Sequence, residues 1–189
     1  MEIQVQCTDG ETSCFTMLDD PGGKEMVESI RPSDFFSQPL LRIQSGKLTR
    51  IFSMNAIESV YFSTSLKAQL RVQQPATTLR TITETEYRET LESLQRRYEP
   101  LEKLFEAGQC IDTVLALHCV SGKVHFLKVE IIARHRVEQL RELNNRLGRM
   151  TSVIPCGGEG YLAINPRNIK WIEMYPAPPE SAHTAWLVD

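Results

Sequence analysis

The sequence Cys119-Val120-Ser121-Gly122 has the same pattern as Cys7-Thr8-Asp9-Gly10, and each stretch lies between two runs rich in apolar residues. The second glycine follows the first by 112 residues, since 122 less 10 gives this number. The Gly-Gly turn at 157–158 follows the Ser-Gly turn at 45–46 by the same interval. One offset shared by two turns indicates an internal duplication, because unrelated matches rarely keep a single register.

The apolar pattern that closes each half keeps this offset as well. Apolar residues recur at i, i+3 and i+5 in both halves, namely at Ile57, Val60 and Phe62 and again at Ile169, Ile172 and Met174. The sequence therefore predicts two copies of one small unit, at residues 1–64 and 112–176.

Each copy has the pattern of two strands around a glycine turn, a helix, a second hairpin and a last strand. Asp9-Gly10 predicts a tight turn between strands at 3–7 and 12–17, since glycine adopts the positive φ that such turns need. The matching strands of the second copy are predicted at 113–120 and 123–131. The expected fold class is α+β, a tandem duplication of a ββαβββ-type unit. Each unit is expected to hold a five-stranded antiparallel sheet and one helix.

The helix of the second copy is indicated by apolar residues at helical spacing, with Gly148 as its stop. The counterpart helix near 24–30 is shorter and is expected to end at Pro32, with one inserted residue in its register. The spaced residues of the longer helix are Ala133, Val137, Leu140, Leu143 and Leu147.

A charged amphipathic helix is predicted at 83–107, after a linker at 65–82. Thr83-Glu84-Thr85-Glu86 has the form of a capping box, in which the Thr83 hydroxyl and the Glu86 carboxylate accept backbone N–H groups. Apolar residues then recur at gaps of four and three, as at the a and d positions of a heptad. This heptad seam comprises Tyr87, Leu91, Leu94, Tyr98, Leu101 and Phe105.

The heptad seam needs a partner, and two partners are possible. It packs either across the sheets of its own chain, as most amphipathic helices do, or against a second chain in a homodimeric coiled coil. Pro100 is expected to kink the helix or to start a second one. Beyond the second copy, the Pro-rich residues 177–189 predict an extended tail.

The composition is that of a globular protein without a strong charge bias. The 189 residues are 41% hydrophobic and carry a formal net charge of -3, so no global positive field attracts nucleic acid or an anionic membrane. No apolar run approaches the roughly 20 residues that cross a bilayer, and the first residues lack a secretory pattern. We therefore expect a cytoplasmic protein without membrane contact. The five cysteines form no Cys-x-x-Cys pair and are expected to be small buried residues.

His118 and His125 are the pair of residues whose spacing suggests metal ligands. A two-residue turn at Ser121-Gly122 would place them opposite each other on adjacent strands. No third ligand has an obvious spacing, and Cys119 is expected on the other face of its strand. We therefore expect no metal and no cofactor.

Five arginines give the predicted helix at 134–149 a local basic character. Two glutamates oppose them, and no aromatic residue interleaves them as in a stacking surface for single strands. Nucleic-acid binding is therefore an alternative, and a solvated helix face is the main interpretation. The arginines of this basic patch are Arg134, Arg136, Arg141, Arg146 and Arg149.

The sequence Gly-Tyr-Leu-Ala-Ile-Asn-Pro at 160–166, followed by Ile169 and Ile172-Glu173 before Pro176, resembles a stretch of the small flagellar FlbD-like family. The resemblance covers residues 160–176. In that family a strand, a glycine turn and a helix follow this stretch, whereas here the comparable segment at 112–144 precedes it. The resemblance implies a small accessory protein without known catalytic residues, so it assigns no site residue.

The sequence contains no recognised catalytic pattern. It has no Gly-x-Ser-x-Gly turn, and its glycine-rich turn at 157–160 lacks the lysine and hydroxyl of a phosphate loop. We therefore expect a non-enzymatic module that binds protein partners or itself through its sheet edges and the heptad seam. The alternatives are a nucleic-acid-binding regulator and a small-molecule or metal-binding protein with a site between the copies.

Overall fold

The computed structural model describes residues 2–16, 35–45, 48–63, 77–97, 110–132, 154–156 and 160–176. The helices predicted at 24–30 and 133–147, the tail at 177–189 and half of the heptad seam lie outside these residues. The described residues include all the strands named below and the linking helix as far as Arg97.

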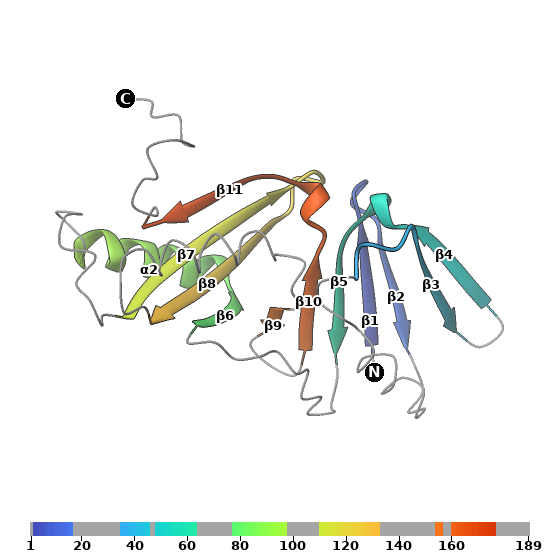
Figure 1. Cartoon of the computed structure of the whole chain (residues 1–189), viewed down its shortest axis with the longest axis horizontal. Coiled ribbons are helices and arrows are strands. Elements are labelled where there is room, and N and C mark those ends of the chain that lie inside the picture. The colour runs from blue at the N-terminus through green and yellow to red at the C-terminus, as the bar shows by residue number, and fades with distance from the viewer. Residues whose placement is uncertain are drawn as a thin grey trace.

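The described residues form two antiparallel sheets, a separate hairpin and one α-helix (Figure 1). The first sheet has the order β2-β1-β5-β10-β9, the second has the order β11-β7-β8-β6, and β3 pairs with β4. This arrangement confirms the predicted α+β class. The strands are β1 (Glu2–Cys7), β2 (Thr12–Thr16), β3 (Leu40–Ser45), β4 (Leu48–Ser53), β5 (Ile57–Ser63), β6 (Thr77–Ile82), β7 (Cys110–Cys119), β8 (Val124–Ile132), β9 (Ile154–Cys156), β10 (Gly160–Ile164) and β11 (Ile169–Tyr175), with the helix α2 (Glu84–Arg97) and the 3-10 turns η1 (Met54–Ala56) and η3 (Pro166–Asn168).

A glycine in the left-handed region closes the first hairpin of each half. Gly10 and Gly122 both have a φ of 91°. The Cys7 N–H donates to Glu11 O at 2.8 Å, and the Gly10 N–H donates to Cys7 O at 3.1 Å, so three residues form the loop. The same two bonds close the second hairpin, from the Cys119 N–H to Lys123 O and from the Gly122 N–H to Cys119 O, so the two-residue turn predicted at Ser121-Gly122 is wrong by one residue. The extra position holds the glycine, because an L side chain would be strained at this φ.

Strand pairing in the two sheets recurs at the interval of 112 residues. Each pair in the β1–β5 ladder has a counterpart in the β7–β11 ladder, as Ile3↔Phe62 has in Leu115↔Met174. Both ladders also shift register before their last pair. The same backbone arrangement therefore occurs twice along the chain.

The two sheets do not each belong to one half of the sequence. β9 and β10 come from the second predicted copy but extend the first sheet, where β10 pairs with β5. Ala163 lies opposite Val60, and both are fully buried, so the pairing of β10 with β5 removes apolar surface of the β5 edge from water. The expected five-stranded sheet within the second copy is therefore wrong. The second sheet instead gains β6, which pairs with β8 and comes from the predicted linker.

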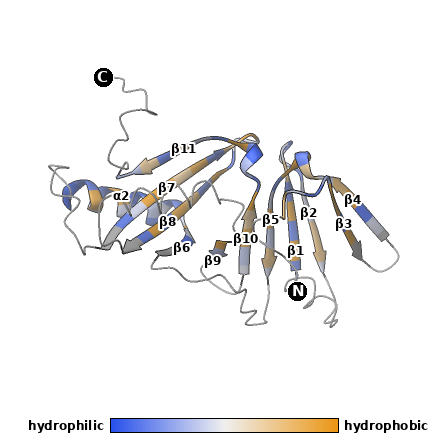
Figure 2. Ribbon diagram, viewed as in Figure 1, coloured by the Kyte–Doolittle hydropathy of each residue, from blue (hydrophilic) through white to orange (hydrophobic). Residues whose placement is uncertain are grey.

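A core of apolar side chains lies between the two sheets. Leu117 and Leu127 of the second sheet pack with Leu162 and Ile164 of β10. Between these two β10 residues, Ala163 points to the opposite face and belongs to the core under the β3–β4 hairpin. Figure 2 shows hydrophobic positions along the strands of both sheets. β10 is thus buried on both faces and joins the two cores.

Helix α2 packs its apolar side on the other face of the second sheet. Tyr87 and Leu94 are buried against Val114 and Ala116 of β7, and Leu91 is partly buried beside them. The described half of the heptad seam therefore lies inside its own chain. The other three seam residues lie outside the described residues.

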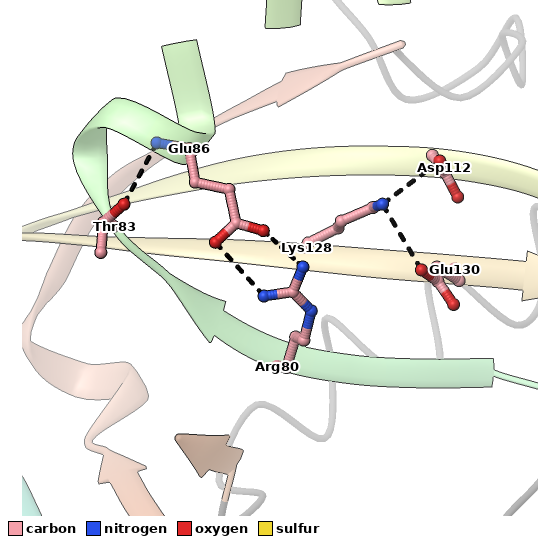
Figure 3. A network of polar contacts seen from close by, with 6 residues as sticks. All are labelled: Arg80, Thr83, Glu86, Asp112, Lys128 and Glu130. Atoms are coloured by element: carbon pink, nitrogen blue, oxygen red, sulfur yellow. Dashed lines mark hydrogen bonds and ion pairs between the residues drawn. The ribbon is translucent and has the colours of Figure 1, made fainter. Parts of the chain in front are cut away.

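The N-terminus of α2 is capped by Thr83, but the capping box is incomplete. The Glu86 N–H donates to Thr83 Oγ1 at 3.1 Å. The Glu86 carboxylate is bound instead by the Arg80 guanidinium of β6, which lowers the pKa of Glu86 (Figure 3). Lys128 likewise lies 3.3 and 3.4 Å from two carboxylates of the same sheet (Figure 3). The start of the helix is therefore tied to the strand that precedes it.

Replacing Thr83 by alanine removes the hydroxyl that accepts the Glu86 N–H. We expect Thr83→Ala to lower the free energy of unfolding by about 1 kcal/mol, the usual cost of losing an N-cap. Urea denaturation followed by circular dichroism measures this change. Thr85→Ala, in the exposed first turn, is the control and should change stability by less than about 0.5 kcal/mol. An equal loss in both variants would contradict the capping role.

Candidate functional site

The 3-10 turns η1 and η3 meet where the two sheets join. The Asn165 side chain donates to the carbonyl oxygens of Met54 and Ile57, each at 2.9 Å. The Asn168 side chain donates to the same Ile57 oxygen at 2.6 Å, and both asparagines are buried. These bonds fix the start of β5 and thereby the position of Glu58, the next residue along the chain.

Glu58 is a carboxylate buried in the apolar strand β5, with no exposed surface. One carboxylate oxygen, Oε2, accepts a hydrogen bond from the Ser121 N–H at 3.0 Å. Ser121 lies in the turn between β7 and β8. The other oxygen, Oε1, is buried and has no hydrogen-bond partner among the described residues. An unpaired buried acceptor costs stability, so a ligand that pairs with this oxygen would be favoured.

Cys119 and His125 face Glu58 from the second sheet, and both are buried. His125 pairs with Leu117 across the β7–β8 ladder, and paired residues point to the same face of a sheet. Cys119 is two residues beyond Leu117 on β7, so its side chain points to that face as well. The prediction that Cys119 faces away from His125 is therefore wrong. The ligand atoms of Glu58, Cys119 and His125 all lie within 4.8 Å of one another. We call these three residues the inter-sheet cluster.

Burial sets the protonation states in the inter-sheet cluster. Desolvation, followed by the charge of Glu58, raises the pKa of Cys119 to about 12, so the thiol is protonated at neutral pH. Desolvation, with a smaller effect of Lys123, lowers the pKa of His125 to about 4, so the imidazole is neutral. His125 Nε2 is buried without a hydrogen-bond partner among the described residues. The cluster thus contains two unpaired polar atoms and a neutral thiol.

The side chains of the inter-sheet cluster are of the types that bind transition metals. Thiolate sulfur, imidazole nitrogen and carboxylate oxygen are all ligands of zinc in proteins. A cysteine beside a histidine is also the basis of thiol catalysis, but a buried thiol with a pKa of about 12 is not ionised at neutral pH. The arrangement therefore suits coordination of a ligand better than nucleophilic catalysis.

His118 does not join the inter-sheet cluster. It lies opposite Val124, because the three-residue turn shifts the ladder by one position from a two-residue turn. Its ring stacks on Trp171 with the ring centroids 4.7 Å apart, and its Nε2 lies 3.2 Å from Glu173 Oε1. The predicted pairing of His118 with His125 is therefore wrong.

Glu58 is the residue of this cluster that sequence reasoning missed. A charge between Ile57 and Val60, in a strand expected to be buried, was the available indication, because an ionised group inside a core needs a partner. Its neighbours in space come from the other half of the sequence, and pairing across the halves was not predicted. The carboxylate could thus be noticed, but not its partners.

A cleft of about 350 Å³ opens between the sheets beside the inter-sheet cluster. Gln4 and Tyr61 line it from the first sheet, and Thr81 and His125 line it from the second. The half-buried Cys156 also lines the cleft, and burial raises the pKa of its thiol. His125 is the member of the cluster that borders this space.

Exposed apolar side chains lie on two strand edges. β11 is the edge strand of the second sheet, and Trp171 and Ile172 on it are 53% and 37% exposed. Ile51 of β4, in the separate hairpin, is 55% exposed. Uncovered strand edges with apolar side chains are typical sites of strand addition. We call β4 and β11, each of which has one strand partner among the described residues, the open edges.

The arginine-rich helix predicted at 134–149 lies outside the described residues, so the structure does not place its basic patch. Nucleic-acid binding through it stays a prediction from the sequence. Among the described residues, no helix has the length and apolar character needed to cross a membrane.

Acid should destabilise the fold through His125. The imidazole has a pKa of about 4 in the fold, whereas in the unfolded chain it titrates near its usual pKa of 6.5. As the pH falls, His125 is therefore protonated in the unfolded chain before it is protonated in the fold. The free energy of unfolding thus decreases as the pH drops from 6.5 through 4. Linkage gives a loss of about 2 kcal/mol at about pH 5.

The variant His125→Leu should not lose this part of the free energy of unfolding in acid, because leucine does not bind a proton. Urea denaturation of both proteins at about pH 7 and about pH 5, with EDTA present, measures the difference. The charged or titratable groups near the ring include Glu58 from β5, Cys119 from β7 and Lys123 beside β8, and Tyr61 and Cys156 line the same cleft. A wild type that loses less stability than the variant in acid would contradict the neutral state and indicate a protonated His125 paired with Glu58.

Comparison with known proteins found no matching family model, no similar curated protein and no similar solved structure. The FlbD-like resemblance remains confined to residues 160–176, which form β10, η3 and β11. No residue role can be transferred from another protein. The function must therefore be argued from the geometry of the inter-sheet cluster and the open edges.

Proposed function

We propose that the protein is a non-enzymatic assembly module that arose by tandem duplication and associates with a second copy of itself by adding β4 to β11. An asymmetry carries this proposal. β10 of the second half pairs with β5 of the first, but the corresponding pair, β4 with β11, is not formed among the described residues. Of two equivalent strand pairs, one is thus formed and the other is not formed among the described residues.

Repeated backbone contacts support the duplication. The Thr8 N–H donates to Ala56 O and the Val120 N–H donates to Asn168 O, both at 2.9 Å. Each residue of the second bond follows its counterpart in the first by 112 positions, as the paired strands and the turn glycines do. The turns η1 and η3 also coincide at this offset. Such agreement is expected if both halves descend from one unit.

The β10–β5 ladder supplies a register for the open edges. In this ladder Ala163 lies opposite Val60. Moving Ala163 back by 112 positions gives Ile51 on β4, and moving Val60 forward by the same number gives Ile172 on β11. The proposed contact therefore pairs two isoleucines that are exposed in the single chain, and their burial would favour association.

The same register matches the neighbouring side chains. It places Arg50 opposite Glu173, a cation against an anion, and Phe52 opposite Trp171, two aromatic rings. Cross-strand pairs of both kinds stabilise antiparallel sheets by roughly 0.2–1 kcal/mol each. The open edges are therefore complementary in charge as well as in apolar character.

A second copy is the partner, because β4 is held away from β11 in its own chain. Arg50 donates to Ser13 Oγ at 3.1 Å, and Phe52 packs edge-on against Phe15, both on β2. β2 and β11 are edge strands of different sheets, and Figure 1 shows β4 and β11 at opposite ends of the molecule. Pairing between two chains does not require β4 to leave its place beside β2.

The proposal predicts self-association that depends on the charges at the open edges. Light scattering should give a mass above that of a monomer for the full chain. Arg50→Glu and Glu173→Arg each place like charges opposite each other and should weaken association at least about tenfold. A mixture of the two variants should associate again, because every contact in a mixed complex then joins opposite charges.

Arg42→Glu is the matched control, since it makes the same charge change at an exposed position on the neighbouring strand β3. It should associate as the wild type does. Circular dichroism shows whether each variant is folded. A wild type that stays monomeric at high concentration, or charge variants that associate normally, would contradict the proposed contact.

A further inference from the structure

We propose that the inter-sheet cluster is a binding site for a divalent transition-metal ion of the zinc type, held by Glu58, Cys119 and His125. This inference is independent of the proposed self-association, because all three ligands belong to one chain and none of them lies on β4 or β11. It assigns a ligand to the one place in the described residues where three buried ligand-type side chains converge.

The spacing of the three ligand atoms fits coordination after a small movement. Zinc lies about 2.3 Å from sulfur and about 2.0–2.2 Å from nitrogen or oxygen, so tetrahedral ligands are about 3.3–3.6 Å apart. The cluster's ligand atoms lie within 4.8 Å of one another. Side-chain rotations that move the ligand atoms by about 1 Å would therefore bring all three within bonding distance of one zinc ion.

The unpaired polar atoms of the cluster are a second, independent reason. Glu58 Oε1 and His125 Nε2 are both buried without a hydrogen-bond partner among the described residues, and the two side chains are 0% and 8% exposed. Buried polar atoms are almost always satisfied, so two orphans side by side call for a missing partner. A metal ion accepts an electron pair from each atom at once.

The carboxylate is already oriented for this role. The Ser121 N–H binds Oε2 of Glu58 and leaves Oε1 free. Ligands of metal sites are commonly held by such second hydrogen bonds, which fix their orientation. The turn that supplies Ser121 also joins the strands that carry Cys119 and His125, so one loop positions the whole set.

The charges of the ligands match the charge of the bound ion. When the ion binds, the S–H bond of Cys119 breaks, the metal–sulfur bond forms and the proton leaves to solvent. The thiolate and the Glu58 carboxylate then carry two negative charges against the two positive charges of the ion, which limits the cost of burying each charge. His125 contributes a neutral nitrogen.

The mixed ligand set distinguishes among ions. Magnesium and calcium prefer oxygen ligands throughout, whereas sulfur with nitrogen favours zinc and its neighbours in the transition series. Three protein ligands leave one position for water, and His125 borders the cleft between the sheets. The ion would link β5 of the first sheet to the β7–β8 hairpin of the second and so fasten the junction between the sheets.

Cobalt(II) added to the full chain after removal of metals with EDTA tests the site, because a cobalt–thiolate bond has its own near-ultraviolet absorption band. We expect one equivalent per chain, the thiolate band and competition by zinc. Cys119→Ser should abolish the band, whereas Cys14→Ser, at an exposed cysteine on β2, should keep it. Zinc should also raise the melting temperature of the wild type.

Glu58→Gln keeps the shape of the side chain but removes its charge, and should weaken zinc binding at least about tenfold, since loss of even an outer-shell group costs this much. Melting in EDTA shows whether the variants fold without metal. If a variant does not fold, the wild-type cobalt spectrum decides alone. No thiolate band in the folded wild type, or the same loss in Cys14→Ser as in Cys119→Ser, would overturn the site. Arg50→Glu should bind cobalt normally, which separates this test from that of self-association.

Discussion

The pairing of β10 with β5 is the contact on which the rest of the described structure depends. Ala163 of β10 belongs to the core of the first sheet, and Leu162 and Ile164 on either side of it belong to the core between the sheets. One strand therefore takes part in both cores, and the burial of its two faces holds the halves together. Directed hydrogen bonds of Asn165 then fix the junction. Without β10, β5 would be an edge strand of the first sheet.

Features that depend on neighbours in the sequence could be predicted. Gly10 and Gly122 identify the first hairpin of each half, because few other residues adopt a φ of 91° without strain. Thr83 identifies the start of α2, because a hydroxyl at that position reaches a backbone N–H three residues on. The α+β class follows from the same local patterns. Each of these features is decided within a few residues of chain.

Features that depend on contacts between the halves could not be predicted in this way. An alternating pattern shows which face of a strand is buried, but not which strand lies beside it, so the exchange of β10 stayed hidden. A turn longer by one residue reversed the predicted relation of Cys119 and His125, because side chains alternate faces along a strand. The error concealed that Cys119 and His125 lie on the same face of the sheet. Glu58, in the middle of an apolar strand, showed only that some partner was needed.

The two halves differ at the positions that matter for chemistry. On the duplication proposed above, the counterparts of the inter-sheet cluster are Lys170, Cys7 and Ser13, and Lys170 is exposed. An ammonium group repels a cation, so this second set cannot hold a metal ion. At the counterpart junction, β4 and β11 are not paired among the described residues, and apolar groups such as Trp171 are exposed there. On the proposals above, one copy holds the chain together and the other would join it to a second chain. Such a division accounts for apolar side chains on a strand edge, which a monomer without partners gains nothing by exposing.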